Sequence, residues 1–264
     1  MPIIENSEFE NKVVVITGAG NGLGRSHAIE YAKRGAKVVV NDLGGSVDGS
    51  GAGDAADQVV AELQAMGAEA VANKASVSDP DGAQSIIQSA LDAFGRIDIL
   101  VNNAGTNRPG PMHEMTLGDF DAVMNLNVRA AYFVAKAVVK KMQLKGQGGS
   151  IINTSSQMGH VGGIDRTIYS ASKHAIEGLT RALAIELGKD NIRVNTICPT
   201  FIRTPMTEKT FANPALVEWI QSKIKLGRIG EIEDVMGAFV FLASDAAAMM
   251  TGSSLMIDGG WTAG

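Results

Sequence analysis

A tyrosine and a lysine that could share a proton stand four residues apart, in the segment Tyr169–Lys173 (YSASK). Residues i and i+4 of a helix lie on one face. An ammonium group beside a phenol favours the phenolate, so Lys173 should lower the Tyr169 pKa from about 10; a shift of three units would require roughly 4 kcal/mol from Lys173 and any cofactor charge together. Tyr169 is therefore a candidate general acid/base. A solvated pair on a helix surface has the same spacing, so the pattern needs support from other residues.

Ser156 stands thirteen residues before Tyr169, just after an apolar run, where its hydroxyl could contact the same substrate oxygen. Its neighbour Ser155 would point in a different direction from an extended segment. A Ser-His-Asp hydrolase is the competing interpretation, but G-x-S-x-G is absent and His174 falls on another helix face than Lys173. The histidines show no paired spacing with cysteine or carboxylates, so the sequence predicts no metal site: His27, His113, His160 and His174.

A glycine-rich turn follows the first apolar run, with the pattern T-G-x-x-x-G-x-G rather than G-x-G-x-x-G. Glycines allow close backbone approach, and the N-terminus of the following helix offers N–H groups to a pyrophosphate. Arg25 and Ser26 after the last glycine exclude a phosphate-binding P-loop with lysine. Tight packing is the alternative function of such a turn. The predicted cofactor contacts here are Gly18, Asn21, Gly22, Leu23 and Gly24.

Asp42 ends the second predicted strand, twenty positions after Gly22. An acidic side chain there can accept hydrogen bonds from an adenosine ribose and would repel a 2′-phosphate. The turn also carries Asn21 where a basic residue would favour the phosphate. These residues favour NAD over NADP, although Asp42 could also be a turn residue beside Gly44 and Gly45.

Asn102, Asn103, Ala104 and Gly105 follow the fourth apolar run. They would lie at the carboxyl edge of a parallel sheet, where open α/β folds bind ligands. The asparagines could tie neighbouring strands together, and Gly105 would admit a cofactor. We therefore predict cofactor contacts at Asn103, Ala104 and Gly105, with a plain strand-ending turn as the alternative.

Short apolar runs alternate with segments of helical periodicity, which predicts an α/β fold with a parallel sheet and helices on both faces. No linker or repeat divides the chain, so a single domain over 1–264 is expected. The predicted strands are 12–17, 37–42, 68–74, 97–102, 150–155, 192–197 and 253–257. The predicted helices are 22–34, 55–66, 80–94, 117–144, 168–187 and 232–243.

Two longer connections interrupt the alternation. The segment Gly44–Gly53 holds five glycines and predicts a mobile loop. The segment Thr200–Leu226 carries Phe201, Phe211 and Trp219, and connections of this length are often functional lids. We expect residues 200–226 to cover the active site.

Composition narrows the class of protein. Glycine makes up 31 of 264 residues without a collagen-like period, and 23 basic against 28 acidic residues give a net charge of −5. Neither charge sign forms a run that could neutralise a nucleic-acid backbone, so no nucleic-acid partner is expected. No membrane-spanning segment or targeting signal is recognised in the sequence. Cys198 is the single cysteine, which fits a reducing compartment, so a cytoplasmic location is predicted.

Together, the motifs resemble the short-chain dehydrogenase/reductase (SDR) family. They are the glycine turn, Asn102–Gly105, Asn127, Ser156, the Tyr169–Lys173 pair, Pro199 with Thr204, and Asp258-Gly259-Gly260. The resemblance covers roughly residues 9–264. It implies a seven-stranded Rossmann fold, a nicotinamide cofactor, and a homotetramer packed through the fourth and fifth helices and the C-terminal strand.

The resemblance also implies roles for individual residues. Tyr169 would be the acid/base, Lys173 would hold the nicotinamide ribose, Ser156 would orient the substrate carbonyl, and Asn127 would complete a water-linked proton relay to Lys173. Further cofactor contacts are implied at Ser76, Val77, Pro199, Thr200, Ile202 and Thr204.

Two of these positions depart from the family pattern. Ser76 stands where members often carry an aspartate that contacts adenine, so its contact would be weaker. Thr200 replaces a glycine, and a β-branched residue must either keep an ordinary backbone or carry strain.

The expected activity is reversible hydride transfer between NAD and a secondary alcohol or its ketone. The front third resembles hydroxyacyl-CoA dehydrogenases, and the back third resembles sugar, polyol and 3-oxoacyl reductases. Gln157 and His160 offer polar contacts and Met158, Met206 and Phe211 offer apolar ones, which favours a small or medium hydroxylated substrate. A 3-oxoacyl thioester reductase and a non-catalytic nucleotide-binding module are the alternatives.

Overall fold

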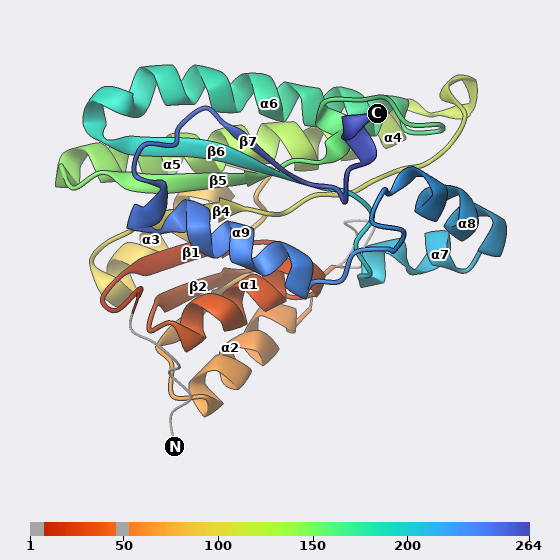
Figure 1. Cartoon of the computed structure of the whole chain (residues 1–264). Helices are drawn as coiled ribbons and strands as arrows, with labels where there is room; N and C mark the ends of the chain where they lie inside the picture. Colours follow the sequence, from red (N-terminus) through yellow and green to blue (C-terminus); the bar gives the residue numbers. More distant parts are fainter. Residues whose placement is uncertain (1–7, 46–52) are drawn as a thin grey trace.

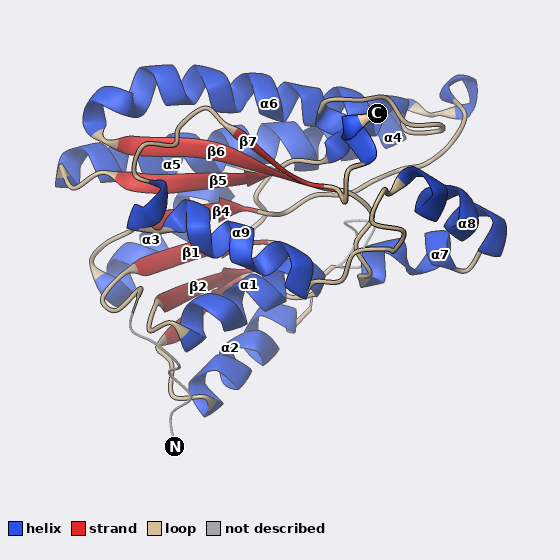
Figure 2. Cartoon of the chain, viewed as in Figure 1, coloured by secondary structure: helices blue, strands red, loops and turns tan. Residues whose placement is uncertain are grey.

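One parallel sheet organises the molecule. The computed structural model describes residues 8–45 and 53–264. Seven strands pair in the order β3-β2-β1-β4-β5-β6-β7, with helices on both faces (Figure 2). The predicted seven-stranded doubly wound sheet is confirmed. The strands are β1 (Val13–Thr17), β2 (Lys37–Asn41), β3 (Ala70–Asn73), β4 (Ile99–Asn102), β5 (Gly149–Thr154), β6 (Ile192–Pro199) and β7 (Ser254–Ile257).

The helices follow the strands as predicted, with two additional short ones between β6 and the last helix (Figure 1). Local signals set several of their ends. In α3, Pro80 is at the first turn, the Asp79 carboxylate accepts a hydrogen bond from the Asp81 N–H, and Gly95 closes the helix at φ 71°. The helices are α1 (Gly22–Lys33), α2 (Ala55–Ala65), α3 (Pro80–Phe94), α4 (Leu117–Met124), α5 (Ala130–Lys145), α6 (Thr167–Leu187), α7 (Glu208–Phe211), α8 (Pro214–Lys223) and α9 (Glu233–Ala243).

Alternation along the central strand divides the core into two layers. Val14 and Ile16 of β1 pack in one apolar cluster with α1, α2 and α9. Val13 and Val15 pack in the other cluster with α3, α5 and α6. All five residues of β1 are buried, as expected for a strand covered on both faces. This rigid sheet holds the strand ends, where the candidate site lies.

The predicted single helix over 117–144 is wrong in one respect. A π-helical turn at Asn125–Arg129 separates α4 from α5, and the Ala130 N–H donates to the Asn125 carbonyl oxygen five residues back. Such turns often occur at functional sites. Here the turn buries Asn127 to 2% exposure.

The combined run Leu117–Lys145 is the one helical stretch, within the described ranges, that has the length and composition to cross a membrane. Its inner face packs in the protein core, through Val123 of α4 and Ala130, Val134 and Val138 of α5. It is therefore a core helix of this fold.

The segment predicted as a lid contains α7 and α8, which project beyond the sheet (Figure 1). Ile220, Ile224 and Ile229 form a small apolar cluster of their own. Phe201, Phe211 and Trp219 pack partly buried against this cluster. These aromatic residues therefore hold the segment together.

The predicted mobile loop at Gly44–Gly53 lies mostly outside the described residues. Its two ends are held at the residues that follow β2: the Gly53 N–H donates to the Leu43 carbonyl oxygen, and the Gly44 N–H donates to Asp42.

Candidate functional site

A cavity of about 650 Å³ lies beyond the carboxyl ends of the strands. Every residue predicted to bind the cofactor lines this cavity except Gly24. Ser156, Tyr169 and Lys173 also line it, whereas Asn127 lies behind it. The fold thus brings segments from both halves of the chain to one place, as ligand sites of open α/β sheets require.

The glycine turn packs too closely for side chains. Gly18 has φ +63°, and a Cβ on it would lie 2.8 Å from the Ala104 Cα. A Cβ on Gly24 would overlap the Gly18 carbonyl oxygen, so Gly24 lies beneath the turn and shapes it. The side chain of the N-cap residue Asn21 makes no capping hydrogen bond, and the first turn of α1 carries no acidic residue. This helix end is suited to an anionic ligand.

Asp42 lines the cavity and holds the turn against β2. One carboxylate oxygen accepts a hydrogen bond from the Gly20 N–H at 2.8 Å, and the other accepts one from the Gly44 N–H at 2.7 Å. Asp42 is therefore a turn residue, as one interpretation of the sequence had it, and it also lines the cavity.

Asn103 ties β4 to β1. Its side-chain amide donates to the carbonyl oxygens of Thr17 and Gly18, at 3.2 and 3.1 Å, and its backbone N–H donates to the Thr17 hydroxyl. Asn102 does the same toward β5, donating to Asn153 at 2.9 Å. These contacts fix the strand ends that form the cavity floor.

Tyr169, Lys173 and Ser156 form the candidate catalytic group. The Lys173 Nζ donates to the Thr154 carbonyl oxygen at 2.8 Å and lies 5.5 Å from the centre of the Tyr169 ring. The Ser156 side chain lies near the Tyr169 phenol and favours its deprotonated form. Ser156 in turn accepts a hydrogen bond from the Met158 N–H at 3.1 Å. The phenol, the ammonium and the serine hydroxyl therefore surround a position that a substrate oxygen could occupy.

Burial determines the titration of this group. It raises the pKa of Tyr169, an effect that the Ser156 side chain and the Arg166 charge reduce but do not cancel. It also lowers the pKa of Lys173 to about 8. The chain without a cofactor therefore does not show the predicted drop in the Tyr169 pKa, because burial outweighs the neighbouring charges.

Asn127 holds the backbone of a neighbouring loop. Its side-chain oxygen accepts from the Thr106 N–H at 2.8 Å, and its amide donates to the Thr106 carbonyl oxygen and to the Ser172 hydroxyl, both at 3.0 Å. Gly105 lies between it and Lys173: a Cβ on Gly105 would be 3.2 Å from the Asn127 Oδ1 and 3.8 Å from the Lys173 Nζ.

Thr200 keeps an ordinary backbone, since its φ is not positive. Its N–H donates to the Ile257 carbonyl oxygen at 3.1 Å. Its hydroxyl is buried at the cavity and has no hydrogen-bond partner among the described residues. Of the two possibilities left by the sequence, the structure therefore has the unstrained one.

Comparison with known proteins gives the family. The model described as "Enoyl-(Acyl carrier protein) reductase" matches residues 18–262. The structure of a short-chain type dehydrogenase/reductase from Mycobacterium marinum superposes with a TM-score of 0.90 at 35% identity, covering 99% of this chain and 100% of the other. The chain belongs to the short-chain dehydrogenase/reductase family.

Curated SDR relatives span almost the same length. A 3-oxoacyl-[acyl-carrier-protein] reductase of Synechocystis is 42% identical, over 94% of this chain and 96% of the relative. L-Rhamnose 1-dehydrogenase (NAD(P)(+)) of Sphingomonas is 38% identical, over 96% of each chain. The protein is accordingly an SDR oxidoreductase that uses NAD(P) on CH–OH groups.

The residues present fit a nicotinamide dinucleotide. The turn excludes side chains at Gly18 and Gly24, the uncapped end of α1 suits a pyrophosphate, and the Thr200 hydroxyl lacks a partner among the described residues. In this SDR site, Gly18–Gly24, Asp42 and Asn103–Gly105 would hold the dinucleotide.

Sequence reasoning missed several lining residues of the SDR cavity. Asn41, Ala75 and Thr154 border motifs that it did identify, and their position at or just after strand ends was the available signal. Met206, which was expected to contact the substrate, does line the cavity. Conversely, Gln157 and His160 lie outside the lining, although they were expected to contact the substrate. Gln157 is 1% exposed, and the His160 ring is turned toward Cys198.

Proposed function

We propose that this protein transfers a hydride reversibly between NAD and a secondary alcohol or its ketone. The observation that carries the proposal is the grouping of Tyr169, Lys173 and Ser156 at the cavity that the glycine turn also lines. The nicotinamide supplies the hydride chemistry when it is bound. The chain positions the substrate and moves its hydroxyl proton.

Each residue has a role in that proposal. Tyr169 takes the proton from the alcohol, or returns it to the ketone oxygen, while Ser156 orients that oxygen by a hydrogen bond. The Lys173 ammonium stabilises the phenolate and holds the nicotinamide ribose. Asn127 orders the Thr106 loop beside Lys173, where a water could connect the two side chains.

The substrate class is tested by a panel with both cofactors. Sugars and polyols stand first, and 3-hydroxyacyl thioesters stand second because of the Synechocystis relative. We expect NADH formation, followed by its absorbance, with at least one member of the first class. Turnover of thioesters alone would select the alternative. Dinucleotide binding without turnover of any member would indicate a non-catalytic nucleotide-binding module.

Cofactor choice is tested at Asp42. Replacing it with alanine or asparagine should reduce the preference of kcat/KM for NAD over NADP by about tenfold, equivalent to about 1.4 kcal/mol. The reason is that either change removes a carboxylate that repels a 2′-phosphate. Asp42→Asn keeps an oxygen for the Gly20 N–H, so it separates charge from turn geometry. A wild-type protein that prefers NADP would contradict this role.

We propose further that residues 1–264 form one domain with residues 200–226 as its substrate lid. Met206 and Thr207 support the lid, because they line the cavity from that segment. The buried free thiol of Cys198 is consistent with a reducing compartment, and we place the protein in the cytoplasm.

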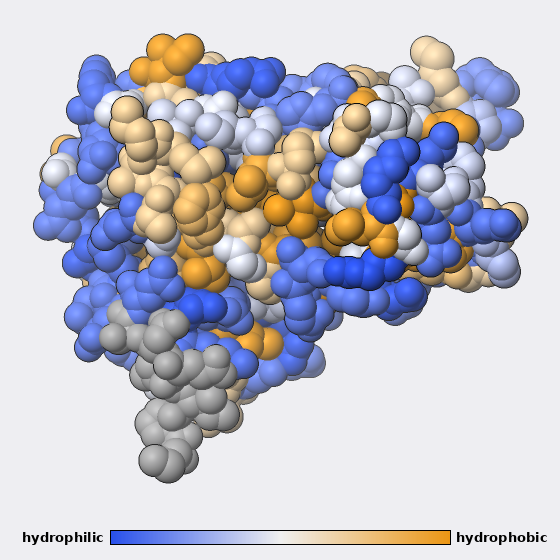
Figure 3. All heavy atoms as spheres, viewed as in Figure 1, coloured by the Kyte–Doolittle hydropathy of each residue, from blue (hydrophilic) through white to orange (hydrophobic). Residues whose placement is uncertain are grey.

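The proposed homotetramer has support in exposed apolar side chains. Leu117 and Phe120 on α4, and Tyr132 and Leu144 on α5, are 47–76% exposed. Hydrophobic residues also gather over α9 and β7 in Figure 3. Light scattering of the purified protein should give four times the chain mass of 27.6 kDa. A mass equal to that of one chain would contradict the proposed homotetramer.

A further inference from the structure

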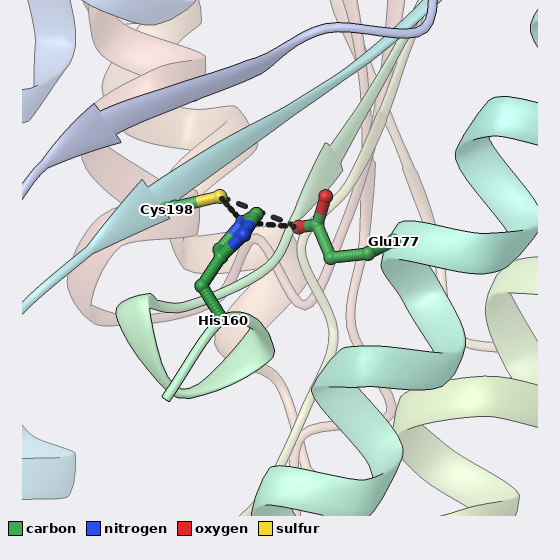
Figure 4. A group of neighbouring side chains, drawn as sticks. All are labelled: His160, Glu177 and Cys198. Atoms are coloured by element: carbon green, nitrogen blue, oxygen red, sulfur yellow. Dashed lines mark hydrogen bonds and ion pairs between the residues drawn. The ribbon is translucent and has the colours of Figure 1, made fainter. Parts of the chain in front are cut away.

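Three potential metal ligands, from separate elements of the fold, converge on one another (Figure 4). His160 follows the short helical turn Gln157–Gly159, Glu177 lies on α6, and Cys198 lies on β6. The sequence predicted no metal site because these residues are far apart along the chain: Cys198 is 38 positions from His160 and 21 from Glu177. The fold, and not local spacing, brings them together.

The distances among the three ligand atoms fit one bound ion. The Cys198 Sγ lies 3.3 Å from the Glu177 Oε1 and 3.5 Å from the His160 Nε2. The His160 Nε2 lies 3.6 Å from the Glu177 Oε1, beyond a good hydrogen bond. Ligands of a tetrahedral zinc ion, bound at its usual distances, are separated by about 3.3–3.7 Å. The sulfur–nitrogen separation matches this geometry, and the two separations to the Glu177 Oε1 are each within about 0.3 Å of it.

Other side chains orient Glu177 toward this position. Its second oxygen, Oε2, accepts hydrogen bonds from the Ser254 hydroxyl at 2.6 Å and the Thr196 hydroxyl at 3.1 Å. These bonds direct Oε1 to Cys198 and His160, as outer-shell partners do in metal sites. Glu177 and Cys198 are almost fully buried, whereas the His160 side chain is 31% exposed and marks the entry.

We propose that His160, Glu177 and Cys198 form a binding site for a zinc-type divalent cation. In this structure the Cys198 thiol donates to the Glu177 Oε1, and on metal binding it would release that proton to solvent. The resulting thiolate, an imidazole and a carboxylate suit zinc, whose fourth position a water could occupy. The site has no part in the proposed hydride transfer. The metal site nevertheless lies close to the candidate catalytic group, because Tyr169, Lys173 and Glu177 follow each other at four-residue intervals on α6.

The test uses the tag-free full-length protein, reduced and freed of metal by a chelator. Titration with Co²⁺ should show one ion per chain, with the visible bands of tetrahedral cobalt and a thiolate charge-transfer band. Zn²⁺ should displace it and raise the Tm. His160→Ala should weaken Co²⁺ binding at least tenfold, and Cys198→Ser should abolish the charge-transfer band.

The matched control is His174→Ala, which removes an exposed histidine from α6 outside the cluster. It should bind cobalt like the wild type. Because His160 is exposed, its variant should fold normally, which circular dichroism checks. Cobalt binding that is equal in wild type and His160→Ala, binding without a thiolate band, or no binding would each overturn the proposal. These readouts do not depend on enzymatic activity.

Discussion

Replacing Tyr169 with phenylalanine should lower kcat by about 10² to 10⁴-fold, the range over which a general acid/base acts. The substitution removes the only group at this position that can exchange a proton with the substrate oxygen. The ring and its contact with Lys173 remain, since the Nζ lies 5.5 Å from the ring centre. Dinucleotide affinity, measured by NADH fluorescence, should therefore change little. Steady-state kinetics with the best substrate of the panel gives kcat.

The control for this prediction is Tyr132→Phe, which makes the same chemical change on the outer face of α5. Tyr132 is 48% exposed and does not line the cavity. Its variant should retain wild-type kcat. Unchanged turnover in Tyr169→Phe would contradict the proposed mechanism. It would favour the alternative interpretation, in which Tyr169 and Lys173 are a structural pair on one helix face.

The strands of the sheet were predictable because each one corresponds to a short apolar run in the sequence. The number of strands in one Rossmann-type sheet was implied by the family resemblance, and every strand lies within a few residues of its predicted bounds. The break between α4 and α5 was not predictable from periodicity. It coincides with hydrogen bonds from Asn127 to Thr106 and Ser172, which are distant in sequence. A contact across the fold therefore accompanies the local change in helix geometry.

In the candidate site, too, the local sequence predicted some features and the contacts across the fold determined others. Types and spacing placed Gly18, Asp42 and Tyr169 at one cavity, because they follow strand ends or share a helix face. The direction of the Tyr169 pKa shift was not predictable. Burial raises this pKa, and the spacing of two residues in the sequence does not show how deeply the fold buries them. For the same reason His160 was assigned to substrate, although the fold turns it to Glu177 and Cys198.

His27 makes the folded protein sensitive to acid. It is 1% exposed, packs 3.8 Å from the centre of the Phe239 ring, and neither ring nitrogen has a hydrogen-bond partner among the described residues. Burial lowers its pKa to about 3 from 6.5. Between these two values the unfolded chain binds a proton that the folded chain does not. The free energy of unfolding therefore falls with decreasing pH, by about 1.4 kcal/mol per unit from this group.

Replacing His27 with leucine should remove this loss. Between pH 7 and pH 4, the wild type should lose about 3 kcal/mol more than His27→Leu, since 2.5 units of that interval lie below the ordinary histidine pKa. At pH 7 the variant should be the more stable by about 1–3 kcal/mol, because no buried polar group is left unpaired. Urea unfolding at one protein concentration measures both. His113→Gln is the control, since His113 has a side chain that is 82% exposed and should leave the pH profile unchanged. Parallel profiles for wild type and His27→Leu would show that the imidazole takes up its proton as readily in the folded core as in the unfolded chain.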